Sequence, residues 1–468
     1  MVFNSVQFAA FLPLVLLLYW RSSGKRQLAV LLVASYFFYG YWDWRFLSLL
    51  AISTVVDFTV GRHIHRSEDV RVRRRWLWLS MGTNLGILGT FKYFNFFVDS
   101  AQSLLERIGL APDPVVLQVV LPVGISFYTF QTMSYTIDIY RGRLEPVPDL
   151  LTFGVYVSFF PQLVAGPIER ATRLMPQLVA ERRKPDGETI ASAVSLIVLG
   201  LVKKVVIGDL LASHVDDVFS RSSALGPLPL LLGVYAFAFQ IYADFSGYSD
   251  VARGVSRLFG IELVRNFEQP YLSRSITEFW RRWHISLSDW LRDYLYIPLG
   301  GNRAGAVATY RNLAITMLLG GLWHGASWAF VVWGALHGGF LVVERLTDSG
   351  GDPDRTLAPR QIPRMVFTFH LVCLAWVFFR APDFGTAFDV LSGIATIGLG
   401  SPDLDLVIHV AFAAVMTLGI DVVQRRSGRH ELFVFRSPSA QGAVMGVAAT
   451  LVILASGGNQ VPFIYFQF

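Results

Sequence analysis

Residues 312–343, NLAITMLLGGLWHGASWAFVVWGALHGGFLVV, contain no Asp, Glu, Lys or Arg. A charge-free stretch of this length is long enough to cross the roughly 30 Å hydrocarbon layer of a bilayer as a helix. Residues 437–468 are equally free of charged residues, and so are the shorter stretches 2–20, 115–137 and 150–168. The recurrence of such stretches predicts a chain that crosses a membrane several times.

The composition of the whole chain agrees with this prediction. Of its 468 residues, 53% are hydrophobic and only 16% are charged, whereas soluble domains have about 25% charged residues. The mean hydropathy is +0.47. These values exclude a soluble enzyme, a disordered chain and a nucleic-acid binder. The net charge of +6 reflects arginines in cytoplasmic loops such as 62–75, as the positive-inside bias requires.

The apolar segments predict an all-α polytopic membrane protein. Serial alternation over segments of about ten residues, the sign of a membrane β-barrel, is not seen. Several segments are too short to span, so we expect about ten to twelve transmembrane helices plus re-entrant and interfacial helices. Segment 150–168 is flanked by arginines on both sides and contains Pro161, Gly166 and Pro167. A re-entrant hairpin would place both flanks in the cytoplasm, and proline would break the helix.

Residues 251–303 form the least apolar long stretch. Trp280, Trp283 and Trp290 recur at spacings of 3 and 7, which would place them on one face of a continuous helix. We therefore expect amphipathic helices at the cytoplasmic interface, with these tryptophans at headgroup depth. On such a helix, Arg281 and Ser288 would share the face of His284.

His324, within the charge-free stretch, is the main candidate for chemistry, because a polar side chain inside an apolar span is costly. Small residues on both sides of it, including Ser327, would let backbones approach closely or leave a narrow channel that Trp323 and Trp328 could line. Imidazole is suited to general-base catalysis at neutral pH. A buried neutral histidine with a structural role is the alternative. His337 should face nearly the opposite way if the helix is continuous.

Other polar residues are weaker candidates. Asp244 and Asp250 are interpreted as charges at a membrane exit, with Asp244 capping its helix or pairing with Arg253. His214 is followed only by two adjacent acidic residues, which is a poor ligand set. No metal is expected.

Two motifs make the sequence specific: WRRWHISLSDWLRDYLYIPLGGNR at 280–303 and GLWHGASWAFVVWGALHG at 321–338. They resemble the membrane-bound O-acyltransferase superfamily, in particular its bacterial branch with the alginate O-acetylation subunit and the D-alanyl transfer protein of teichoic acid modification. Residues 1–20, FFPQLVAGPIER at 159–170 and FIYFQF at 463–468 also match that branch. The resemblance covers essentially the whole chain.

The resemblance implies a ring of helices around a central tunnel, and one domain over 1–468. Interfacial helices would occupy 251–303, and the helices of the catalytic histidine 304–345. His324 matches the family's essential membrane-embedded histidine. His284 matches the second histidine, at a place where many eukaryotic relatives carry Asn.

The expected activity is transfer of an acetyl group from cytoplasmic acetyl-CoA, for O-acetylation of an extracytoplasmic polysaccharide such as alginate, another exopolysaccharide or peptidoglycan. His324 would act as general base or transient acyl carrier, and His284 would orient the thioester. We expect a donor surface for the CoA phosphates and a tunnel lining. The donor surface is assigned to Arg281, Arg282, Trp283 and Arg292, and the lining to Trp323, Trp328, Ser327 and Asp289.

No permanently bound cofactor is expected. The expected partners are the bilayer of the bacterial inner membrane and a periplasmic SGNH-type acetyltransferase. Three alternatives stay open. The first is a transporter or flippase of an acyl carrier, with His324 as a proton relay, and the second is D-alanyl-type acyl transfer from a carrier protein. The third is a purely structural scaffold, in which no single histidine matters.

Overall fold

The computed structural model describes residues 1–110, 116–117, 120–164, 166–347, 359–398, 400–432, 437–456 and 462–464. Within these residues every regular element is a helix. In this described part of the chain, six helical stretches are long and apolar enough to cross a membrane: Lys25–Arg66, Gly187–Ser220, Pro227–Leu258, Trp328–Leu346, Pro359–Arg380 and Leu404–Ser427. The predicted class, an all-α multi-pass membrane protein, is confirmed. Shorter apolar helices accompany these six, and the total of about ten to twelve spans stays a prediction.

The described chain forms two compact units. The first comprises Met1–Thr189 and Val255–Val264, and the second comprises Ile190–Gly254 and Arg265–Phe468. Several helices start at a Ser or Asp whose side chain accepts a backbone N–H of the first turn, as N-caps do; examples are Ser5, Asp69, Asp149, Ser275 and Ser327.

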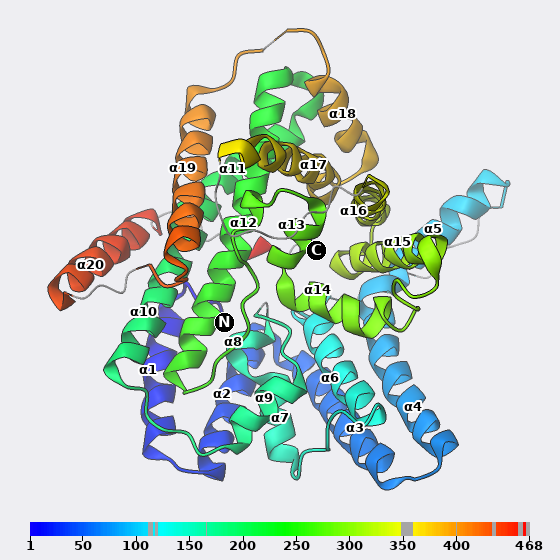
Figure 1. Cartoon of the computed structure of the whole chain (residues 1–468), viewed down its shortest axis with the longest axis vertical. Coiled ribbons are helices and arrows are strands. Elements are labelled where there is room, and N and C mark those ends of the chain that lie inside the picture. Colours follow the sequence, from blue (N-terminus) through cyan, green and yellow to red (C-terminus); the bar gives the residue numbers. More distant parts are fainter. Residues whose placement is uncertain are drawn as a thin grey trace. The chain divides into compact units, whose positions relative to one another are not determined.

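In the first unit, α3, α4 and α6 lie side by side (Figure 1) and bury a polar cluster. Asp57 of α3 accepts hydrogen bonds from Ser80 and Asn84 of α4, and Ser80 lies 3.0 Å from the Thr136 hydroxyl of α6. A buried carboxylate is tolerated because these donors surround it. The helices of this unit are α1 (Val6–Arg21), α2 (Lys25–Asp43), α3 (Leu47–Arg66), α4 (Val70–Leu88), α5 (Phe94–Arg107), α6 (Ile125–Tyr140), α7 (Leu150–Ser158), α8 (Phe160–Leu163) and α9 (Ala171–Val179).

The helix over 150–168 is broken, as its prolines predict. α7 ends at Ser158 and α8 begins at Phe160, with Pro161 in the first turn of α8. Gly166 then passes so close to the preceding helix that a Cβ atom would lie 2.3 Å from the Cα of Gln162. That the segment re-enters the membrane from one side stays a prediction.

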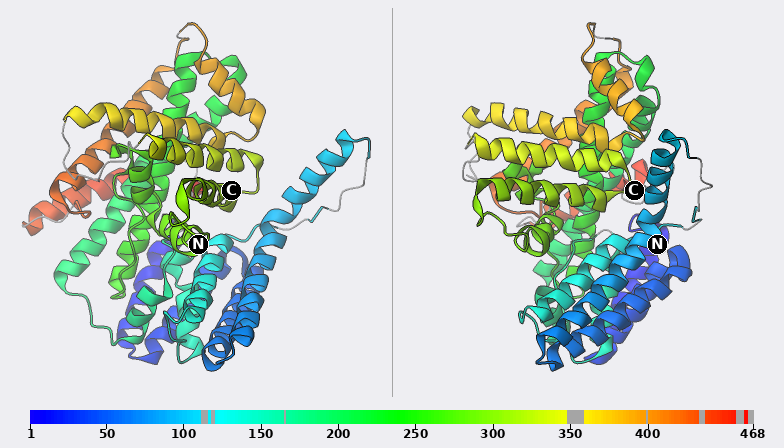
Figure 2. Two further views of the ribbon diagram at one scale, coloured as in Figure 1. Left: turned by 45° about the vertical axis from the view of Figure 1, so that its right-hand side comes forward. Right: turned by 90° about the vertical axis from the view of Figure 1, so that its right-hand side faces the viewer.

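The second unit contains the catalytic candidates. Figure 2 shows α15, α16 and α17 as consecutive helices stacked side by side. The π-helical segments η3 (Val202–Gly208) and η6 (Arg292–Tyr296) interrupt the α-helical runs. The helices are α10 (Gly187–Leu201), α11 (Asp209–Ser220), α12 (Pro227–Leu258, which continues into the first unit), α13 (Ile276–Arg282), α14 (Ile285–Leu291), α15 (Gly305–His324), α16 (Trp328–Leu346), α17 (Ile362–Arg380), α18 (Phe384–Ile394), α19 (Leu404–Ser427) and α20 (Pro438–Ala455).

One prediction for this unit is wrong. Residues 280–290 do not form a continuous amphipathic helix, because α13 ends at Arg282 and α14 begins only at Ile285. Trp280, Trp283 and Trp290 are all buried, so they do not form an exposed interfacial face. The chain bends at Trp283 and His284, and both side chains are fully buried. The spacing of residues along the sequence does not predict such a bend.

Candidate active site

The structure brings His284 and His324 together although they are forty residues apart in the chain. The centroids of the two imidazole rings are 6.4 Å apart, and the ring planes form an angle of 66°. His284 is fully buried and His324 is 3% exposed. Two imidazoles at this separation can address one small reacting group from two directions.

His324 is the last residue of α15, and the chain reverses immediately after it. Ser327 caps α16, accepting a hydrogen bond from the amide of Ala329 at 3.2 Å. The reversal is tight: a Cβ atom at Gly321 would lie 2.2 Å from the carbonyl oxygen of Phe330, and one at Gly334 would lie 2.3 Å from that of Met317. Close approach of backbones, one of the two roles considered for the small residues, is therefore seen at Gly321; the narrow channel stays a prediction.

His284 lies in the break between α13 and α14, in a left-handed backbone conformation with φ 44° and ψ 54°. A non-glycine residue in this region costs about 1–2 kcal/mol. Asn266 stabilises the turn. Its carbonyl oxygen accepts from the amide of Ile285 at 2.9 Å, and its side-chain oxygen accepts from the Ser286 hydroxyl at 2.7 Å. Asn266 is thus a positioning residue for His284.

Aromatic rings surround both histidines. Phe245 lies edge-to-face against His284 at 4.7 Å, and Trp323 is within 5.8 Å of His284 and 5.1 Å of His324. Trp333 lies 5.0 Å from His324, with Phe379 at 5.3 Å. Such a shell disfavours the charged imidazolium. Accordingly, burial lowers the pKa of His284 to about 3, which makes this side chain neutral at physiological pH.

The expectation that His337 faces away from His324 is wrong. It assumed one continuous helix, whereas α15 and α16 are separate helices packed against each other. Trp333 lies between the two histidines, 4.8 Å from His337. Neither ring nitrogen of His337 has a hydrogen-bond partner among the described residues. His337 thus contacts Trp333, which in turn contacts His324.

An arginine-rich pocket of about 530 Å³ lies beside the turn that carries His284. Arg281 and Arg282, two of the predicted donor-surface residues, line it at the end of α13. Trp283, in contrast, is fully buried. Arg292, the first residue of η6, forms ion pairs with Asp289 of α14 and with Asp293. The pocket is lined by Arg265, Glu268, Gln269, Glu278, Arg281, Arg282, Gln424, Arg425, Gly428, Arg429 and His430.

The residues predicted to line a tunnel do not share one environment. Trp323 is buried and contacts both histidines. Ser327 caps α16, and Asp289 pairs with Arg292 at 2.7 Å. Trp328 is 54% exposed. Whether these residues line a tunnel stays a prediction.

A buried ion network on α12 escaped the sequence interpretation. Asp250 pairs with Lys203 at 2.8 Å, and Asp244 pairs with Lys204 at 2.8 Å. Neither aspartate therefore behaves as a membrane-exit charge. The sequence did contain a signal for this network: Lys203 and Lys204 lie in the otherwise apolar run 190–207. Buried charges require partners of opposite charge, so two such lysines predict buried acidic residues nearby.

The closing motif packs beside this network. Phe463 contacts Tyr248 at 4.7 Å and Phe245 at 5.9 Å, and the amide of Ile464 donates to Asp244 at 2.7 Å. Phe245 in turn contacts His284. The C-terminal motif thus supports the wall behind His284; its residues 465–468 lie outside the described residues.

A buried pair of imidazoles in an aromatic shell, set in a multi-pass helical protein, is the candidate active site. The sequence model of the membrane-bound O-acyltransferase family matches residues 141–381, which include both histidines. The chain belongs to this family and is an acyltransferase.

The names of similar proteins agree with this family assignment. The chain is 45% identical to "Probable alginate O-acetylase AlgI" of Azotobacter vinelandii over 85% of this chain and 79% of the relative. It is 44% identical to the protein of the same name in Pseudomonas aeruginosa, over 85% and 75% of the two chains. The peptidoglycan O-acetyltransferase of Helicobacter pylori is 37% identical over 86% of this chain and 81% of its own length.

Proposed function

We propose that this chain is a membrane O-acetyltransferase that takes an acetyl group from cytoplasmic acetyl-CoA. The acetyl group serves the O-acetylation of an extracytoplasmic polysaccharide of the alginate or peptidoglycan type. The names of the relatives support this substrate class. The observation that carries the proposal is the buried pair of His284 and His324, with ring centroids 6.4 Å apart.

The arginine-rich pocket is suited to the donor. It contains five arginines and two glutamates, which favours a ligand with several phosphates. Two of the arginines already have structural partners: Arg282 pairs with Glu278 at 3.0 Å, and Arg425 donates to the carbonyl of Leu272 at 2.9 Å. Arg265, Arg281 and Arg429 are exposed. We assign these three to the phosphate groups of CoA.

The proposed transfer is a nucleophilic acyl substitution. An acceptor hydroxyl attacks the thioester carbonyl carbon while His324 takes the hydroxyl proton. The new C–O bond forms, the C–S bond breaks, and the proton passes from His324 to the departing thiolate, which leaves as CoA thiol. Neutral His284 donates its N–H to the carbonyl oxygen as negative charge develops there. The aromatic shell excludes water and so limits hydrolysis of the thioester.

The proposed location is the bacterial inner membrane. CoA remains in the cytoplasm and only the acetyl group passes to the other side. There a periplasmic SGNH-type acetyltransferase delivers it to the polymer. Passage of the acyl group through the protein removes any need to move CoA across the bilayer.

The test uses a strain that lacks the gene and carries wild-type, His324→Ala or His370→Ala protein. Ester-linked acetate released by mild alkali from surface polysaccharide and from peptidoglycan is measured, with membrane insertion checked by immunoblot. His370, an exposed histidine of α17 that contacts Tyr235, is the control. Wild type and His370→Ala should restore acetylation, and His324→Ala should not. Full acetylation with well-inserted His324→Ala would refute the proposal.

A second measurement separates the remaining alternatives. Inverted membrane vesicles from the same strains expose the cytoplasmic face to added acetyl-CoA. The proposed enzyme releases free CoA thiol in a manner that depends on His324. A flippase of a preformed carrier releases none, and a D-alanyl-type enzyme requires a charged carrier protein instead.

A further inference from the structure

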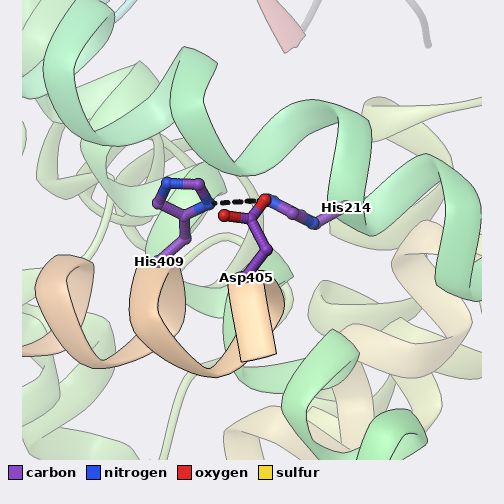
Figure 3. Close-up of side chains that lie close together, drawn as sticks. All are labelled: His214, Asp405 and His409. Atoms are coloured by element: carbon purple, nitrogen blue, oxygen red, sulfur yellow. Dashed lines mark hydrogen bonds and ion pairs between the residues drawn. The ribbon is translucent and has the colours of Figure 1, made fainter. Parts of the chain in front are cut away.

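A second cluster of chemically competent side chains lies away from the histidine pair, between α11 and α19. Figure 3 shows His214 of α11 and Asp405 and His409 of α19 pointing toward one another. Asp405 and His409 are four residues apart and therefore share one face of their helix. Nε2 of His214 is 2.8 Å from Nδ1 of His409, and each of these nitrogens is 3.4 Å from Oδ2 of Asp405.

We propose that His214, Asp405 and His409 form a binding site for a divalent transition-metal ion, with zinc as the best-matched ion. Two imidazole nitrogens and one carboxylate oxygen are a ligand set that zinc uses, with water in the fourth position. Imidazole-rich sets also select against magnesium and calcium, which prefer oxygen ligands.

Two of the three distances match those between ligands of one cation, and the third is that of a direct hydrogen bond between the imidazoles. Zinc–nitrogen and zinc–oxygen bonds of about 2.0–2.2 Å in a tetrahedron place ligand atoms about 3.3–3.5 Å from each other. Both nitrogen–oxygen separations of 3.4 Å have this value and exceed the 2.7–3.2 Å of ordinary N–H···O hydrogen bonds. Only the nitrogen–nitrogen separation must widen, by about 0.5 Å, which small rotations of the rings can supply.

The three side chains are accessible to solvent, and Asp405 forms no ion pair with other described residues. The exposed fractions of the side chains are 18% for His214, 26% for His409 and 60% for Asp405, which leaves an entry path for the ion. In the part of the chain that the structure describes, the two histidines are the only ion-pair partners of Asp405. The nearby Asp216 is paired with Arg380 at 2.6 Å.

The site is at the end of α19 opposite the arginine-rich pocket. Asp405 and Arg425 are twenty residues apart on this helix, a rise of about 30 Å. Because the basic end of a spanning helix faces the cytoplasm, the site faces the extracytoplasmic side. A metal ion there would cross-link α11 to α19, whose other end contributes Gln424 and Arg425 to the pocket.

The test uses the full-length protein in detergent, purified without a polyhistidine tag. After removal of metal with a chelator and dialysis against Zn²⁺, bound zinc is measured by mass spectrometry. We expect about one equivalent per chain. His214→Ala and His409→Ala should each weaken zinc binding beyond the roughly 10–100-fold that loss of an outer-shell partner costs. His65→Ala, an exposed histidine of α3, should leave it unchanged.

A second readout guards against variants that fail to fold. Co²⁺ in place of zinc should give the intense visible bands of a tetrahedral site, and the conservative variant Asp405→Asn should weaken them while the protein stays monodisperse. Two results would overturn the proposal: no zinc retained by the wild type, or zinc binding that is equal in the wild type and both alanine variants.

Discussion

His430, on the wall of the arginine-rich pocket, hydrogen-bonds through Nε2 to Oδ1 of Asp250, inside α12, at 2.7 Å. Lys203 binds the other oxygen of the same carboxylate at 2.8 Å. The pocket proposed for the donor therefore shares a side chain with the buried ion network. Mutations in the network should affect both the stability of the unit and the shape of the pocket.

Lys203→Met should strongly destabilise the protein. It leaves the buried Asp250 carboxylate without its ammonium partner, and breaking a buried ion pair in this way costs about 3–5 kcal/mol. The double variant Lys203→Met with Asp250→Asn should recover a large part of the loss, because no uncompensated charge remains. Thermal unfolding in detergent measures both variants. If the single and double variants unfold alike, the carboxylate is not the source of the instability.

Arg281→Ala and Arg429→Ala should each raise the KM for acetyl-CoA by about three- to tenfold and leave kcat nearly unchanged. Both arginines are exposed on the pocket, so the loss is smaller than that for a buried charge. Initial rates of CoA release give both constants. Arg221→Ala, which removes an exposed arginine paired with Asp217, is the matched control. Higher salt should raise the KM of the wild type and flatten these differences; a salt-independent KM would argue against phosphate binding here.

Gly325→Ala should inactivate the enzyme through a steric clash next to His324. A Cβ atom at position 325 would lie 2.1 Å from the ring of Phe330, and overpacking of this kind costs about 1–3 kcal/mol. Adding Phe330→Ala should restore part of the activity, because the clash is with a side chain. Gly339→Ala, in the same hairpin of helices with nothing within 4 Å, should behave like wild type. A fully active Gly325→Ala variant would show that the reversal after His324 is looser than the structure indicates.

Acid should destabilise the protein in part through His284. Its pKa is about 3 in the native state because it is buried, against 6.5 when unperturbed. Between these values the unfolded chain binds a proton that the native chain does not, so the free energy of unfolding falls as pH falls, by up to about 1.4 kcal/mol per pH unit. This contribution is complete above pH 6.5 and is lost toward pH 3.

The variant His284→Asn isolates this contribution, because asparagine tolerates the left-handed backbone and does not titrate. The unfolding midpoint of His284→Asn should depend less steeply on pH than that of the wild type. His65→Asn, which changes an exposed histidine, should keep the wild-type slope. Identical slopes for all three proteins would show that His284 does not titrate on unfolding.

The sequence predicted what depends on local composition. Charge-free runs and a proline-rich break are visible in the order of residues, so the membrane class and the interruption after Ser158 could both be foreseen. His324 could be selected because imidazole is rare and costly within an apolar run. His284 became a catalytic candidate only through the resemblance to the family, because the residues next to it in the sequence resemble the solvated face of a helix.

What escaped prediction depends on contacts between distant segments. The helical-wheel argument for His337 failed because it took the chain as one helix through Gly325–Ser327. Lys203 and Asp250 are 47 residues apart, and no periodicity links them. The three side chains of the proposed metal site likewise come from positions 214 and 405–409, so His214 had no visible ligand partner in the sequence.

The left-handed turn at His284 also constrains how this position can vary over evolutionary time. Among residues with a side chain, Asn, Asp and His are several-fold enriched in that conformation; in this protein Gln269 also adopts it, with φ 49°. A mutation to a branched or bulky residue would cost free energy in the backbone, whatever the chemistry of the new side chain. The turn therefore biases neutral drift at this position toward short polar side chains, which can still present a nitrogen or oxygen to the neighbouring ring.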